Sequence, residues 1–177
     1  RQYAHSVPAG IVLNIHPSYP DSASSADQKA AQMASDYLFH WYLTPILTGS
    51  YPDLLEDLPD DIQPEIATGD MAIISEKIDF LGLNYYTRAV YRSTNCGWFE
   101  EVERNDYPKT EMGWEITPHA FTDLLIGLHQ RYDLPPIYIT ENGAAMDDRL
   151  ESGRVVDAQR IDYFQTHLNA LAQAMDA

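Results

Sequence analysis

Cysteine, basic residues and long apolar stretches are all scarce in this sequence of 177 residues. Cys96 is its single cysteine, which excludes an internal disulfide framework and any cysteine-based zinc cluster. No apolar run approaches the roughly 20 residues that a membrane-spanning helix needs. The low cysteine content fits a cytoplasmic protein, and we expect that location, with the proviso that a signal preceding Arg1 would lie outside the sequence.

Positive charge is the next deficit. The sequence has 11 Lys and Arg residues against 27 Asp and Glu residues, a formal net charge of −16. Nucleic acids and anionic membranes would repel such a chain, so we expect neither as a partner. The six histidines form no His-Glu-x-x-His motif or close ligand pair, and no nucleotide or flavin motif is present. We therefore expect no metal site and no cofactor.

The rest of the composition is that of a packed globular domain, with 45% hydrophobic and 21% charged residues. The sequence begins at Arg1 without a signal peptide. Its last helical pattern runs into the final residues without a glycine, asparagine or proline stop signal. We expect a single domain over residues 1–177 that is truncated at both ends.

The first part of the chain predicts a strand followed by a helix. Residues 10–15 form a continuous apolar run, typical of a buried strand, and two prolines predict a loop over 16–20. Ser24 or Ser25 is suited to cap a helix that Pro45 and Gly49 close. The predicted apolar face of this helix comprises Ala30, Met33, Ala34, Tyr37, Leu38 and Trp41. One or two short helical turns are expected within the irregular stretch 51–76.

Two further strand and helix pairs follow. Residues 78–86 and 137–141 predict buried strands, and 88–115 predicts an elaborate loop with room for a hairpin. Thr117-Pro118 predicts a helix start with a hydroxyl cap and proline at the first helical position. Asp157 is suited to cap the last helix, after a polar loop over 142–156. The predicted buried positions of these two helices are Phe121, Leu124, Leu125 and Leu128, and then Ile161, Phe164, Leu168, Leu171 and Met175.

Alternation of apolar strands with helices indicates an α/β fold with a parallel sheet covered by helices. Most of the long loops follow strands, which is typical of a (β/α)₈ TIM barrel, whose active site is built at the carboxyl ends of the strands. A doubly wound sheet would have the same order, but no Gly-x-Gly-x-x-Gly turn follows any strand. Three strands cannot close a barrel, and a closed barrel typically needs about 250 residues. The fold is therefore expected as a partial barrel.

Glu141 is the sharpest candidate for chemistry, because it is a carboxylate at the end of an apolar strand. By strand periodicity it shares a face with Ile137 and Ile139, and Asn142-Gly143 then turns the chain away sharply. A charged group placed there should be functional or paired, since unpaired burial costs several kcal/mol in order of magnitude. The alternative is a glutamate on the barrel rim that forms a salt bridge.

Asn84 and Tyr86 provide possible companions for Glu141. Both lie at the carboxyl end of the second predicted strand and share one face. If the two strands are neighbours, an amide and a phenol lie near Glu141 and can orient the carboxylate and keep it ionised. The alternative is that Tyr86 covers the core with its ring and leaves its hydroxyl in water.

The sequence resembles glycoside hydrolase family 1, the β-glucosidase family of retaining (β/α)₈ barrels. The resemblance covers essentially the whole chain and corresponds to barrel strands five to seven. It rests on motifs that occur in the family's order. These are Val12-Leu13-Asn14 with Pro17 and Pro20, Gly49-x-Tyr51-Pro52, Asp79 to Thr87, Met112-Gly113-Trp114-Glu115, Ile139-Thr140-Glu141-Asn142-Gly143 and Arg160-Ile161-Asp162-Tyr163.

The resemblance implies a role for each matching residue. Glu141 would be the catalytic nucleophile, which forms a covalent glycosyl-enzyme that water then hydrolyses. Tyr86 would hydrogen-bond the nucleophile and Asn84 would lie beside it. Trp114 would form part of the wall on the aglycone side, and Asn14, together with His16, would lie near the aglycone entrance.

The second carboxyl that a retaining mechanism requires is missing from the sequence. The family carries this acid/base in an Asn-Glu-Pro motif after strand four, and these 177 residues contain no such motif. Glu111, Glu115 and Asp147 lie near predicted strand ends, but nothing in the sequence marks one of them as a substitute. The acid/base is therefore expected outside this chain, and the chain alone is expected to be inactive.

The function that the resemblance implies is hydrolysis of terminal β-D-glucosyl residues from a β-glucoside or a short β-linked oligosaccharide. Two alternatives remain. The chain could be a non-catalytic fragment or folding partner that binds the other barrel half, since its sheet would have two open edges. It could also belong to a 6-phospho-β-glycosidase, whose phosphate-binding residues would lie beyond residue 177.

Overall fold

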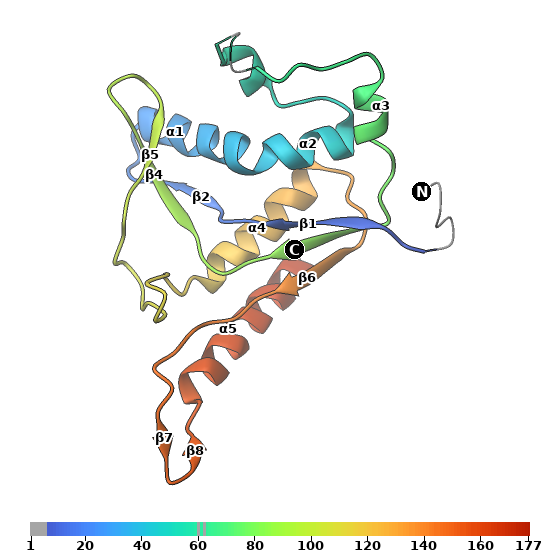
Figure 1. Cartoon of the computed structure of the whole chain (residues 1–177). Helices are drawn as coiled ribbons and strands as arrows, with labels where there is room; N and C mark the ends of the chain where they lie inside the picture. The colour runs from blue at the N-terminus through green and yellow to red at the C-terminus, as the bar shows by residue number, and fades with distance from the viewer. Residues whose placement is uncertain (1–6, 60, 62) are drawn as a thin grey trace.

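The structure is a computed structural model that describes residues 7–59, 61 and 63–177 (Figure 1). Groups of strands alternate with groups of helices along the chain. In order they are β1 Gly10–Asn14, β2 Ser18–Pro20, α1 Ser25–Ser35, the π-helical turn η1 Asp36–His40, α2 Trp41–Thr48, the 3-10 turn η2 Asp53–Asp57, α3 Asp70–Ile74, β3 Phe80–Asn84, β4 Ala89–Ser93, β5 Phe99–Glu101, α4 Pro118–Arg131, β6 Ile137–Glu141, β7 Leu150–Glu151, β8 Arg154–Val155 and α5 Ala158–Met175.

The central sheet consists of β1, β3 and β6, with β3 in the middle and all strands parallel. Leu81 pairs with Ile11 on one side and with Ile137 on the other. This arrangement confirms the predicted parallel sheet, and it is the architecture of three consecutive strand and helix units of a TIM barrel. In Figure 1 the strands fan out below α2 and beside α4 and α5.

Only one face of this sheet is covered by described residues. Leu81, Leu83 and Tyr85 are buried, whereas Val12 is 49% exposed and Tyr138 is 60% exposed. The prediction of buried strands is therefore wrong for one face of β1 and β6 in this structure. The strand residues are apolar as predicted, but among the described residues no segment covers the face of the sheet opposite the helices.

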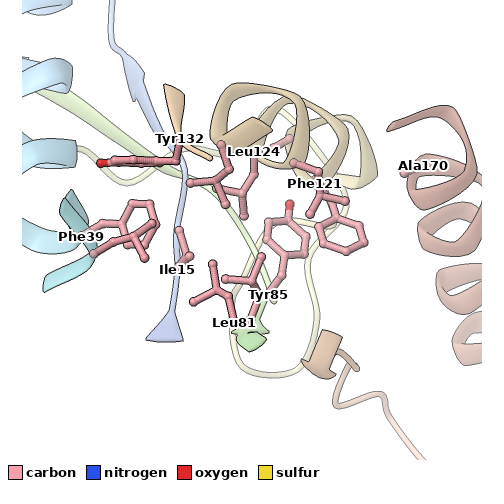
Figure 2. Packing of buried hydrophobic residues seen from close by; sticks show 13 residues of the cluster. Ile15, Phe39, Leu81, Tyr85, Phe121, Leu124, Tyr132 and Ala170 are labelled. Atoms are coloured by element: carbon pink, nitrogen blue, oxygen red, sulfur yellow. The ribbon is translucent and has the colours of Figure 1, made fainter. Parts of the chain in front are cut away.

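The core lies between the covered face of the sheet and the helices (Figure 2). The ring of Tyr85 stacks on Phe121 of α4, with 4.7 Å between ring centroids. Burial of the predicted α4 positions is confirmed, and Phe39, Leu43 and Ala170 bring η1, α2 and α5 into the same cluster. Removal of these side chains from water is the main force that holds the helices on the sheet.

The helix predicted from Ser24 begins as expected, but its apolar face changes direction. The Ser24 side chain accepts a hydrogen bond from the Asp27 amide, and α1 starts at the next residue. The π-helical turn then inserts extra residues per turn and rotates the later positions. Phe39 is buried as a result, while Leu38, predicted to be buried, is 49% exposed and Tyr37 is also exposed.

Three of the predicted helix ends differ in detail. Pro45 lies inside α2 rather than closing it, and Gly49, with φ of 77°, ends the helix in the left-handed conformation. Thr117 and Asp157 precede α4 and α5 as predicted, but neither side chain makes the capping hydrogen bond. Both side chains have other partners, because Thr117 lies within hydrogen-bonding distance of Tyr85 and Asp157 pairs with Arg160.

The last helix presents a different face to the core than its apolar pattern predicts. Tyr163, His167 and Ala170 are the buried residues of α5. The predicted positions Ile161, Phe164, Leu168 and Met175 are exposed, and only Leu171 packs partly against the core. The rings of Tyr163 and His167 stack on one another, with 3.9 Å between centroids, and His167 Nδ1 lies 2.8 Å from the Tyr163 carbonyl.

Two smaller sheets lie beyond the carboxyl ends of the central strands. β2, β4 and β5 form one of them, and β4 and β5 make the hairpin expected within 88–115. Ala89 and Tyr91 of this sheet pack against Ala31 and Ala34 of α1. The antiparallel pair of β7 and β8 was not predicted, because it lies in the polar segment 142–156. Among the described residues, no helix is both long and apolar enough to cross a membrane.

The rotated face of the first helix can be tested by comparing two neighbouring residues. Replacement of buried Phe39 (Phe39→Ala) should lower the free energy of unfolding by about 3–5 kcal/mol, through lost burial and a cavity. Leu38→Ala should lower it by less than about 1 kcal/mol, because about half of Leu38 is already exposed to water. Equilibrium urea unfolding measures both values. Equal costs for the two substitutions would contradict the π-helical turn.

Candidate active site

The candidate site lies where the carboxyl ends of β1, β3 and β6 meet. Asn14 pairs with Asn84 across β1 and β3, and Asn84 pairs with Glu141 across β3 and β6. Three of the residues singled out in the sequence therefore form one row at the same edge of the sheet. This is the edge at which parallel α/β barrels place their functional groups.

A bulge between β3 and β6 determines where Glu141 lies. Leu83 pairs with Ile139, but the next residue, Asn84, pairs with Glu141, so Thr140 is the additional residue on β6. The expectation that Glu141 shares a face with Ile137 and Ile139 is therefore wrong. Those two isoleucines pack against the core, while Glu141 is exposed on the side that carries Tyr86.

The carboxylate of Glu141 has one direct hydrogen-bond donor in the described structure. The Tyr86 hydroxyl donates to Glu141 Oε2 over 2.6 Å. This hydrogen bond raises the pKa of Tyr86 above its ordinary value, because loss of the phenol proton would place two negative charges together. The predicted pairing of Tyr86 with Glu141 is thus present, and the alternative in which Tyr86 only covers the core is not.

Asn84 lies next to Glu141 but bonds elsewhere. Its Oδ1 atom accepts a hydrogen bond from the Thr140 hydroxyl over 2.6 Å. This contact ties the side chain of the bulge residue to the neighbouring strand and supports the position of Glu141 indirectly.

Trp114 is brought to the site from a distant loop. Its ring lies 5.5 Å from that of Tyr86 and 6.4 Å from that of His16, measured between centroids. A tight turn presents it, since Gly113 has φ of 78° and the Thr110 amide donates to the Trp114 carbonyl. Aromatic rings from three loops therefore border the row of polar residues.

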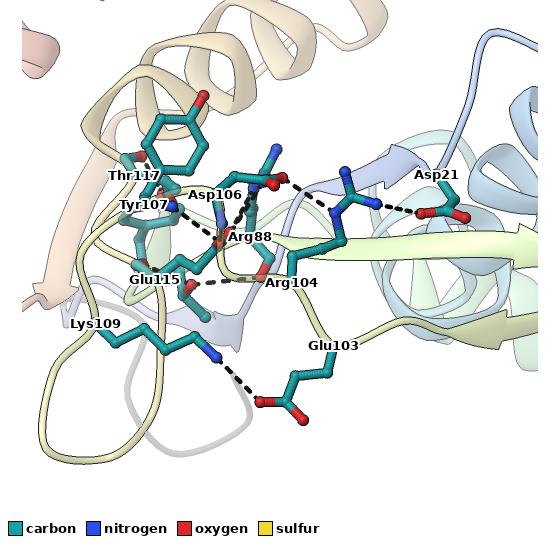
Figure 3. Close-up of polar contacts among 11 residues, drawn as sticks. Asp21, Arg88, Glu103, Arg104, Asp106, Tyr107, Lys109, Glu115 and Thr117 are labelled. Atoms are coloured by element: carbon teal, nitrogen blue, oxygen red, sulfur yellow. Dashed lines mark hydrogen bonds and ion pairs between the residues drawn. The ribbon is translucent and has the colours of Figure 1, made fainter.

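Of the three acids considered as substitutes for the missing acid/base, Glu115 is already fully engaged (Figure 3). It is buried, and both of its carboxylate oxygens accept hydrogen bonds, from Arg88 and from backbone amides. It cannot donate a proton to a substrate in this arrangement. Asp147 binds Arg149 and Glu111 is exposed, so neither is held near Glu141 by the described structure.

Three hydrogen bonds behind Glu141 were not identified from the sequence. The Asn142 side chain donates to the Tyr85 carbonyl over 2.9 Å and to the Tyr163 hydroxyl over 3.0 Å. Arg160 Nε donates to the Ala144 carbonyl over 3.0 Å. The first two turns of α5 therefore hold the segment that follows Glu141. The three-residue spacing of Arg160 and Tyr163, which places them on one helix face, was the available signal.

Comparison with known proteins decides the family. A profile described as glycosyl hydrolase family 1 matches residues 1–177. The chain belongs to this family. It is 38% identical to a β-glucosidase of Agrobacterium over 97% of its own length, and 39% identical to β-glucosidase A of Thermotoga maritima over 94%.

The fold agrees with solved structures of the family. The chain superposes on a family 1 β-glucosidase from Exiguobacterium antarcticum with a TM-score of 0.90 and 39% identity, covering 99% of this chain and 40% of that one. A family 1 β-glucosidase from Thermotoga maritima in complex with isofagomine lactam gives the same TM-score at 37% identity. The chain spans about 40% of the length of these bacterial relatives.

No cluster of three or more potential metal ligands occurs among the described residues. His40 bonds the Tyr132 hydroxyl over 2.7 Å, and burial lowers its pKa to about 4. His167 stacks on Tyr163, and burial lowers its pKa too. These two histidines therefore have structural roles in the core, whereas His5 lies outside the described residues.

The Tyr86–Glu141 contact predicts an unusual titration. Because the pKa of Tyr86 is raised, its proton and the hydrogen bond persist above about pH 10, the ordinary tyrosine pKa, and are lost as pH rises through the raised value. The Tyr86 pKa can be measured by NMR of isotope-labelled tyrosine, with the Tyr86 signal assigned by its loss in Tyr86→Phe. In Glu141→Gln the pKa of Tyr86 should fall back towards the ordinary tyrosine value, because the carboxylate charge is gone. The same Tyr86 pKa in both proteins would contradict the contact.

Proposed function

We propose that this chain forms the nucleophile-bearing part of a retaining β-glucosidase that hydrolyses terminal β-D-glucosyl residues. The observation that carries the proposal is the Glu141 carboxylate at the carboxyl edge of the sheet, with the Tyr86 hydroxyl 2.6 Å from Oε2. Membership of glycosyl hydrolase family 1 and the names of the β-glucosidase relatives support it.

In the proposed reaction, Glu141 attacks the anomeric carbon of the glucosyl residue. A carbon–oxygen bond forms to the carboxylate as the glycosidic bond breaks, and an acid protonates the departing oxygen. Water then attacks the same carbon, gives its proton to the conjugate base of that acid and releases Glu141. Since no described residue donates to Glu141 Oε1, we propose this oxygen as the attacking atom.

The acid/base is proposed to lie outside this chain. It must stand about 5–5.5 Å from the nucleophile in a retaining enzyme. Glu115 is occupied by Arg88, and the family's Asn-Glu-Pro motif is absent from the sequence. We therefore propose that the chain acts together with further barrel segments of the kind that the longer relatives contain.

The proposed substrate is a β-glucoside or a short β-linked oligosaccharide. Asn84 and Tyr86 are proposed to lie beside the glucosyl residue, and Trp114 and Asn14 on the aglycone side, because their positions surround Glu141 at the sheet edge. A 1,4-β-D-glucan glucohydrolase of Thermotoga neapolitana is 39% identical to the chain, which favours an oligosaccharide among the substrates. We propose a cytoplasmic location on the basis of the single cysteine.

The exposed apolar residues support the alternative of a piece that binds the rest of a barrel. Ile161, Phe164 and Leu168 on α5, and Val12 and Tyr138 on the sheet, lie in water in the described structure. Apolar surface of this kind favours association. This alternative complements the catalytic proposal, since the same docking would bring an acid/base to Glu141. The names of the relatives reported above give no support to a phosphorylated substrate.

A chemical rescue experiment on the complete barrel enzyme tests the role of Glu141. With a dinitrophenyl β-glucoside, whose leaving group needs no acid, Glu141→Ala should lower turnover by roughly 10⁴-fold or more. Added azide should restore turnover by attacking the face that the carboxylate vacates, giving the α-glucosyl azide and dinitrophenolate.

The matched control is Glu111→Ala, which removes an exposed acid from the neighbouring loop and should leave turnover near normal. Near-normal hydrolysis by Glu141→Ala, or formation of the β-azide, would contradict the assignment of Glu141 as the nucleophile.

A further inference from the structure

An ion pair lies behind Trp114, away from the reacting groups. The guanidinium of Arg88 and the carboxylate of Glu115 are 2.9 Å apart, and their side chains are only 10% and 7% exposed (Figure 3). An ion pair this well buried is costly to desolvate, and it persists where its geometry and additional hydrogen bonds are favourable. The proposed chemistry uses neither residue.

Glu115 joins two loops through its carboxylate. Oε2 accepts a hydrogen bond from Arg88 Nε over 3.0 Å. Oε1 accepts from the backbone amides of Asp106 and Tyr107, over 2.6 and 3.2 Å. The segment around 106–107 is thereby held against the residue that directly follows Trp114.

Arg88 extends this network towards the strand ends. Its guanidinium also pairs with Asp106 over 2.8 Å, and Asp106 pairs with Arg104, which in turn pairs with Asp21. The guanidinium carbon lies 4.9 Å from the centre of the Tyr107 ring. The buried Arg88 guanidinium therefore connects the segments that follow β3 and β5, and the more exposed Arg104 extends the connection to Asp21 after β2.

The same contacts fix the backbone on which Trp114 stands. The Thr87 hydroxyl donates to the Glu115 carbonyl over 2.8 Å, and Thr87 lies between Tyr86 and Arg88 in the chain. The Thr110 amide donates to the Trp114 carbonyl over 2.9 Å. Tyr86 and Trp114 are thus held by neighbouring residues of one network, which fixes the 5.5 Å separation of their rings.

We propose that Arg88 and Glu115 are positioning residues that hold Trp114 against Tyr86 and thereby set the preference for glucosides with large aromatic aglycones over those with a small leaving group. This inference rests on the proposed function. An aromatic wall stacks only on a leaving group large enough to reach it, so its displacement should affect aryl glucosides and leave glucosyl fluoride unaffected.

The test compares kcat/KM for a nitrophenyl β-glucoside with kcat/KM for β-glucosyl fluoride in the complete barrel enzyme. Glu115→Gln should lower the ratio of the two values by roughly three- to tenfold, mainly through a higher KM for the aryl substrate. Trp114→Ala should lower the ratio by a similar factor. The matched control is Glu100→Gln, which removes an ion pair to Arg92 of which both side chains are about half exposed, and should leave the ratio unchanged.

A double variant covers the case in which Glu115→Gln fails to fold because the buried Arg88 loses its buried carboxylate partner and keeps only the more exposed Asp106. Arg88→Met with Glu115→Met removes both charges, and folding stability should be largely retained. Its kcat/KM ratio should still be lowered, since the contacts that orient the Trp114 loop are gone. A folded double variant with the wild-type ratio, or an equal fall for both substrates, would overturn the positioning role. A wild-type enzyme that hydrolyses neither substrate would instead contradict the proposed function, and this inference with it.

Discussion

The bulge between β3 and β6 is the constraint on which the candidate site depends. A regular register would direct Glu141 towards the helices, together with Ile137 and Ile139. The additional residue, Thr140, lets Glu141 pair with Asn84 and meet the Tyr86 hydroxyl on the open side. The hydrogen bond from the Thr140 hydroxyl to Asn84 Oδ1 stabilises the bulge. A local departure from regular pairing therefore places the carboxylate where it can meet a substrate.

The surroundings of the site are built in two different ways. Behind Glu141, neutral hydrogen bonds from Asn142 to Tyr85 and Tyr163 connect the segment to the core. Behind Trp114, the connection is a buried ion pair whose oxygens are all satisfied. Buried groups with every partner in place are rigid, whereas the exposed pairs elsewhere on this acidic surface contribute little to stability.

The order of elements and the residues at the strand ends could be predicted because both follow from short-range rules. Apolar runs mark the strands, and Ser24 and Thr117-Pro118 mark helix starts. Three features could not be read from periodicity. The π-helical turn buries Phe39 in place of Leu38, the bulge changes the face of Glu141, and α5 buries Tyr163 and His167. Each depends on contacts between distant segments, which a local pattern does not contain.

The most direct test of the central claim is to trap the covalent intermediate on wild-type protein. The reagent is a 2-deoxy-2-fluoro-β-glucoside with a dinitrophenyl leaving group, which departs without acid assistance, while the fluorine slows hydrolysis of the glycosyl-enzyme. Intact-mass measurement and peptide mapping should give one adduct, on Glu141, and none in Glu141→Gln. An adduct on another residue, or no adduct in a protein that hydrolyses the parent dinitrophenyl glucoside, would contradict the account.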